Sequence, residues 1–133
     1  MNQQEITLRV PGKREYALVL RLALGGVAML KDLDAGALDD LRNASDEAVD
    51  CLLHQGRKVD WLTLQVRDSG ESLTVRICAE FDGTGAGSAD ADEIEVSRAV
   101  LETLIPQVEM CAKDCGCVEA IVLTLKKAVA MGA

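Results

Sequence analysis

The sequence predicts an α+β fold of two layers, in which one mixed, mostly antiparallel sheet is covered on one face by three helices. Five short segments alternate apolar with polar residues, whereas three others repeat apolar residues every three or four positions. These segments follow one another as strand, helix, helix, strand, strand, helix, strand and strand. With 133 residues, 49% of them hydrophobic, the chain is expected to form a single domain over 1–133.

The first half of the chain is expected to contain one strand and two helices. Apolar and polar residues alternate over 6–10 and stop at a Pro-Gly pair, which indicates a strand with one buried face. A helix is expected over 13–30, and the pair Gly25-Gly26 within it indicates close packing against a neighbour. Asp34 is a favoured N-cap residue, so the second helix is expected from there to about residue 55.

The second half returns to a period of two, which indicates strands, and then contains one more helix. The segment 68–71 has the composition of a turn, so its flanking segments are expected to form an antiparallel hairpin. In order, we expect hairpin strands over 61–66 and 73–79, a glycine-rich loop over 81–92, a helix over 94–105, and strands over 108–111 and 118–125.

The charge of the chain narrows its possible partners. A net charge of −8 argues against nucleic acid, because phosphate binding requires clustered Lys and Arg, and it favours the basic face of another protein. No apolar run reaches membrane-spanning length, and residues 1–10 lack the regions of a signal peptide. We therefore expect a cytosolic (cytoplasmic) protein without membrane association. Five cysteines, an odd number, are then expected to be mostly reduced thiols.

Chemically active side chains gather in the second expected helix, in the segment ASDEAVDCLLHQ over 44–55. On a helix its apolar residues form one row, and Glu47, Asp50 and His54 share a second face. Glu47 is a candidate general base or one more solvated acid, and the residues alone leave both interpretations open. His54 is expected at the helix end, where the helix dipole favours it.

The order of elements, together with ITLRVPGKREYALVLRLALGGVA and DDLRNASDEAVDCLLHQ, resembles the anti-sigma factor serine kinases of the histidine-kinase-like, or Bergerat, ATPase superfamily. The resemblance covers nearly the whole chain and implies the fold of that superfamily. In the family, the second helix carries a Glu that acts as base and, four residues later, an Asn whose oxygen binds magnesium on ATP. These positions are Glu47 and Cys51 here. A neutral thiol offers magnesium no oxygen ligand.

The family's adenine-reading motif, Asp-x-Gly at the end of a strand, should fall at 79–81. Ala79 has no carboxylate there, and Phe81 cannot replace a glycine. A shifted loop just downstream would supply the other candidate residues of the nucleotide pocket, which are Asp82, Gly83, Gly85 and Gly87.

The family's glycine-rich lid, which wraps the triphosphate, should fall at 94–97. Glu95 and Ser97 stand where glycines are expected, and Glu95 adds negative charge near the phosphates. These three departures from the family's motifs remove the magnesium ligand, the acceptor for adenine and the backbone N–H groups that would surround the phosphates.

The resulting expectation is a bacterial regulatory protein that binds another protein, with nucleotide chemistry lost or much weakened and no cofactor. The resemblance implies a sigma factor or an anti-sigma antagonist as partner, and a homodimer formed through the sheet edge or the first helices. The alternative is an active serine/threonine kinase that uses Mg-ATP, with Glu47 as base and the segment 82–87 around the nucleotide.

A third hypothesis is a metal or redox sensor that uses Cys111, Cys115 and Cys117, three soft ligands within a short segment. A structural zinc site usually needs four ligands, so no metal is expected. In the competing interpretation, the segment is a hairpin tip with exposed thiols that alternate between faces.

Overall fold

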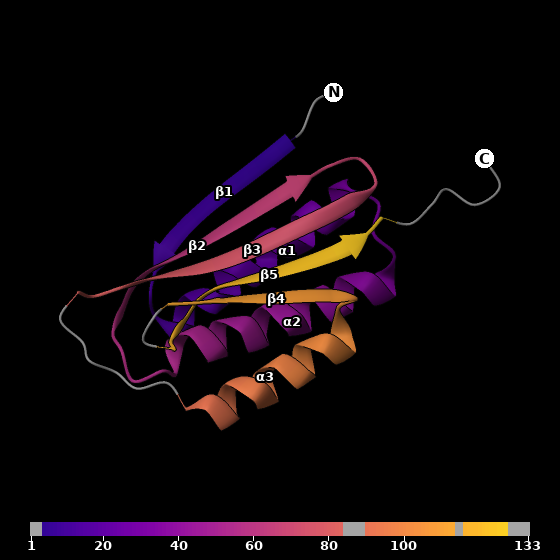
Figure 1. The fold of residues 1–133 in the computed structure, drawn as a ribbon. Coiled ribbons are helices and arrows are strands. Elements are labelled where there is room, and N and C mark those ends of the chain that lie inside the picture. The colour runs from indigo at the N-terminus through magenta and orange to yellow at the C-terminus, as the bar shows by residue number, and fades with distance from the viewer. Residues whose placement is uncertain (1–3, 84–89, 114–115, 128–133) are drawn as a thin grey trace.

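The computed structural model describes residues 4–83, 90–113 and 116–127 and has the expected order of elements. Along the chain these are β1 (Gln4–Pro11), a short 3-10 helix η1 (Arg14–Tyr16), α1 (Ala17–Leu30), α2 (Ala35–Leu53), β2 (Val59–Asp68), β3 (Ser72–Phe81), α3 (Ala91–Leu104), β4 (Gln107–Ala112) and β5 (Val118–Lys126). The three α-helices lie on one side of the sheet (Figure 1), which confirms the α+β sandwich. Within the described ranges, each helix is too short or too polar to span a bilayer.

The described strands form one sheet in the order β1-β2-β3-β5-β4, and every pair of neighbours is antiparallel. The expectation of a mixed sheet is wrong in this respect. Helix α3 connects β3 to β4, which run in the same direction, but β5 lies between these strands and is antiparallel to both. The connection through α3 therefore does not create a parallel pair.

The hydrophobic core lies between the sheet and the helices. The register places Leu64 opposite Ile77 and Ile77 opposite Ile121, and all three side chains are buried. The alternate positions point to the other face, where the guanidinium carbon of Arg9 lies 4.2 Å from the ring centroid of Trp61. The expected alternation of buried and exposed residues in the strands is confirmed.

Helix α2 begins where its cap predicts. The carboxylate of Asp34 accepts a hydrogen bond of 2.7 Å from the backbone N–H of Ala37. The helix ends at Leu53, with His54 as the C-cap residue, and Gly56 follows with φ of 73°, a left-handed conformation that glycine adopts readily.

The two glycines of α1 differ in their surroundings. A Cβ atom on Gly25 would lie 3.1 Å from the Nη2 atom of Arg42 on α2, so this glycine does allow close packing of the two helices. A Cβ atom on Gly26 would meet nothing within 4 Å, and this residue is exposed. The expectation of close packing is thus correct for Gly25 and wrong for Gly26 within the described chain.

Asp68, at the end of β2, joins three parts of the fold. Its carboxylate lies 2.6 Å from the Nζ of Lys127, which follows β5, and 3.2 Å from the Nζ of Lys31, which follows α1. It also accepts a hydrogen bond from the N–H of Gly70 in the hairpin turn. The hydrogen bond from Lys127 contributes most, and that from Gly70 next, to lowering the pKa of Asp68 to about 2.

Replacement of Asp68 by Asn should lower the melting temperature at neutral pH, because two ammonium groups lose their counter-charge. The folded-state pKa lies below the ordinary value of 3.8, so the stabilisation is complete above pH 3.8 and is lost as the pH falls to about 2. The difference in melting temperature between wild type and Asp68→Asn should shrink over that interval. The control is Glu5→Gln, which removes the exposed ion pair with Arg67 and should have a smaller effect. A difference independent of pH would contradict the prediction.

Candidate functional site

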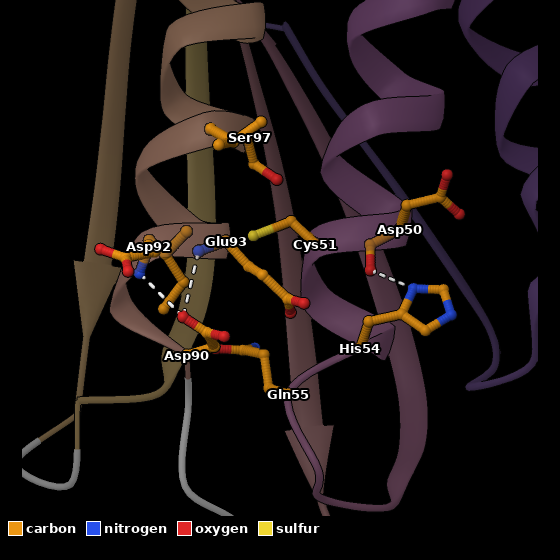
Figure 2. A pocket seen from close by; sticks show the side chains of 10 residues that line it. Asp50, Cys51, His54, Gln55, Asp90, Asp92, Glu93 and Ser97 are labelled. Atoms are coloured by element: carbon orange, nitrogen blue, oxygen red, sulfur yellow. Dashed lines mark hydrogen bonds between the residues drawn. The ribbon is translucent and has the colours of Figure 1, made fainter.

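A cavity of about 440 Å³ lies between the C-terminal half of α2 and the N-terminal half of α3. Its size is within the range of small-molecule pockets. Figure 2 shows its polar lining from close by. The described residues that line it are Asp50, Cys51, His54, Gln55, Asp90, Asp92, Glu93, Ile94, Val96 and Ser97.

Cys51 forms the wall on the α2 side. Its thiol points toward α3, the helix that carries Ser97 (Figure 2). Burial raises the pKa of Cys51, and the nearby carboxylate of Glu47 raises it further, whereas the Ser97 hydrogen bond and Arg98 lower it. The thiol is therefore the neutral form at neutral pH, and it is neither an activated nucleophile nor an oxygen ligand for a hard cation.

Asp90 occupies the start of α3. Its Oδ1 atom accepts hydrogen bonds from the backbone N–H groups of Asp92, at 2.9 Å, and of Glu93, at 3.3 Å. The first N–H groups of a helix are the ones that hold a phosphate or another anion in many binding sites. Here the protein's own carboxylate takes two of them, and Asp92 and Glu93 add two further negative charges in the first turn.

His54 and Asp50 form the end of α2 beside the cavity. The Nδ1 atom of His54 lies 2.8 Å from the backbone oxygen of Asp50. A carbonyl oxygen only accepts, so in this hydrogen bond Nδ1 carries the proton. The carboxylate of Asp50 forms an ion pair with Arg14 of η1. This pair holds the Asp50 carboxylate toward the start of α1.

Gln55 connects α2 to the first residue of β5. Its side-chain Nε2 donates to the backbone oxygen of Val118 at 2.8 Å, and its Oε1 accepts from the N–H of Val118 at 2.6 Å. Nε2 also lies 3.3 Å from the backbone oxygen of Leu52. The buried amide thus pairs with Val118 as a neighbouring strand would, and it fixes the floor of the cavity against the sheet.

The residues singled out in the sequence do not all meet at this cavity. Cys51 lines the cavity. Glu47 lies about one turn earlier on α2 and is not among the described residues that line the cavity. Asp82 and Gly83 follow β3, where the N–H of Asp82 donates to the backbone oxygen of Lys58 at 2.8 Å. Asp82 and Gly83 are also not among the described residues that line the cavity. Gly85 and Gly87 lie outside the described residues.

The expected lid at 94–97 belongs to a helix. Helix α3 begins at Ala91, so these residues lie within its first two turns. The expected loop over 81–92 therefore overlaps the end of β3 at Phe81 and the start of α3 at Ala91. Glu95 pairs with Arg98 at 3.3 Å and is outside the described lining, whereas Ser97 faces Cys51. The acidic residues at the cavity, Asp90, Asp92 and Glu93, were not among the expected ones. The sequence signal for them was Asp90 as an N-cap before two acids.

Strands β4 and β5, which flank the cysteine segment, form an antiparallel hairpin as expected, but the described thiols are not exposed. Cys117 is fully buried, and its backbone oxygen accepts from the N–H of Lys113 at 2.8 Å. Cys111 is half-buried on β4, and Cys115 lies outside the described residues. Among the residues with described positions, no group of three or more His, Cys, Asp or Glu side chains is placed to hold a metal ion.

Comparison of the chain with models of protein families and with curated proteins gives no match.

Replacement of Gln55 by Ala should destabilise the fold by about 2 to 4 kcal/mol, because the buried N–H and C=O of Val118 would lose their partners. Chemical denaturation followed by circular dichroism measures this change. The control is Gln107→Ala, at an exposed position on the edge strand β4, which should change the free energy of unfolding by less than about 0.5 kcal/mol. Equal effects of the two substitutions would show that the Gln55 amide adds no specific stabilisation.

Proposed function

We propose that the chain is a regulatory protein that acts by binding another protein, on the histidine-kinase-like scaffold of the anti-sigma factor serine kinases, with nucleotide chemistry lost or much weakened. The order of elements agrees with the resemblance seen in the sequence. The cavity between α2 and α3 is lined by Cys51. The resemblance assigns the family's magnesium ligand to this position.

The observation that carries the proposal is the chemistry of this cavity. A triphosphate would have to displace the Asp90 carboxylate from the N–H groups at the start of α3. It would also be repelled by the negative charges of Asp92 and Glu93. Cys51 offers no oxygen ligand for the magnesium ion that would offset this repulsion. Each of these features weakens the binding of Mg-ATP, and they act together.

Exposed residues of α3, two of which also line the cavity, support the proposal of a protein partner. Val96 and Val100 are one helical turn apart and exposed, and Glu93, Glu95 and Glu102 on the same helix are exposed acids. Apolar anchors surrounded by acids fit a partner segment that carries basic and apolar side chains. A sigma factor or an anti-sigma antagonist, as the resemblance implies, is the proposed class of partner.

An active kinase is the alternative, and the size of the cavity is the observation in its favour. In that case Glu47 would act as base, and the segment that begins with Asp82 would contact the nucleotide.

Calorimetric titration of the protein with ATP and ADP in the presence of Mg²⁺ separates the two functions. We expect no binding tighter than a Kd of roughly 100 μM, which corresponds to about −5.5 kcal/mol. Binding with a Kd below this value that is lost in Glu47→Ala or Asp82→Ala would support the kinase and refute the proposal. Asp39→Ala, at an exposed acid near the start of α2, is the matched control for loss of charge and should not alter the result.

A further inference from the structure

The cavity between α2 and α3 has apolar walls as well as acidic ones. Ile94 is half-buried on the α3 side, and the neutral thiol of Cys51 forms the wall on the α2 side. Val96 lines the cavity and is also 64% exposed, so it lies at the mouth. Val100, one turn later, is exposed as well and continues the apolar wall onto the surface of α3. These walls suit a ligand that carries methylene groups.

A carboxylate reaches across this cavity. The side chain of Glu93 extends from α3 toward α2 (Figure 2). Asp90 and Asp92, from the same end of α3, line the cavity as well. Among the residues with described positions, no Lys, Arg or His forms an ion pair with Glu93. A cation brought into the cavity from outside would compensate this charge.

The basic side chains around the cavity have other partners. Arg98, the next basic residue on α3, forms an ion pair within its own helix, and Arg14 pairs with Asp50 on the α2 side. His54 lines the cavity, but its Nδ1 atom faces the backbone oxygen of Asp50. The described part of the chain therefore supplies no counter-charge to Glu93 at this place.

The shape and charge of the cavity favour a guanidinium group among the possible cations. A metal ion is a poor occupant, because no group of three or more ligating side chains is described at any place in the chain. An arginine side chain combines a stem of methylene groups with a flat head of several N–H donors, so it suits apolar walls and a carboxylate at once. A free polyamine would leave Val96 and Val100 uncovered, whereas a protein segment would cover both.

We propose that the cavity receives an arginine side chain of the partner protein, with its methylene groups against Ile94 and Val96 and its guanidinium group beside the carboxylate of Glu93. This inference rests on the function proposed above, because it specifies the chemistry of the partner at the same cavity. It gives the space between α2 and α3 a use that requires neither a phosphate nor a metal ion.

Titration of the isotope-labelled full chain with a capped Leu-Arg-Leu peptide, followed through the backbone N–H signals in NMR spectra, tests the proposal. We expect the signals of residues 51–55 and 92–97 to shift most, with a Kd of about 1 to 10 mM for so short a peptide. A Leu-citrulline-Leu peptide has nearly the same shape without the charge. It should bind at least about fivefold more weakly, because it forms no charge-assisted hydrogen bond with a carboxylate.

Glu93→Gln assigns this preference to one side chain. Gln keeps the size of the side chain and its place in the first turn of α3, so the variant should fold like wild type. The two peptides should bind this variant with Kd values within about twofold of each other. The matched control is Glu109→Gln on β4, an exposed acid that is not among the described lining residues, and this variant should keep the fivefold preference.

Three results would each overturn the proposal. These are equal binding of the two peptides to wild type, a preference for arginine that survives in Glu93→Gln, and tighter binding of spermidine than of Leu-Arg-Leu at the same N–H groups. Each would leave the proposed function standing, because that function fails only if Mg-ATP binds in the calorimetric titration.

Discussion

Helix α2 imposes the constraint on which the rest of the structure depends, because it packs against both other helices and against β3 and β5 in the centre of the sheet. Small residues on its buried side, Ala44 and Ala48, are fully buried and let it approach its neighbours closely. Side chains on the two flanks of α2 determine how it contacts α1 and α3. Arg42 meets Gly25 of α1 on one flank, and Cys51 meets Ser97 of α3 on the other.

The cavity beside α2 is large enough for a small molecule but is chemically unsuited to an anion. Its walls have the volume for a small molecule, yet the groups that would hold an anion already hold the Asp90 carboxylate. A helix cap is stabilising in itself, so Asp90 makes the start of α3 sturdier as it removes the place for a phosphate. The same carboxylate that caps α3 thus takes two N–H groups that an anion could otherwise use.

Local rules were sufficient for most of the fold. The cap at Asp34 and the hairpin around residues 68–71 followed from residue type and period, and the structure confirms both. Three features could not be predicted, because they depend on distant contacts. These are the position of β5 between β3 and β4, the burial of Cys117, and the open side of Gly26. At the site, Cys51 was identified through the resemblance, four residues after Glu47. Gln55 could not be identified in this way, because it acts through Val118, far along the chain.

The place of β5 in the sheet also determines when the sheet can form all its strand pairs during synthesis. Among the described strands β4 pairs with β5 alone, and β3 receives its second neighbour from β5 as well. Strand β5 follows all the other described strands in the chain, so it is the last of them to be synthesised. Until then β4 has an unpaired edge on both sides and α3 has no finished sheet beneath it. The nascent chain therefore exposes unpaired strand edges until β5 has been made, and such edges can pair with other chains.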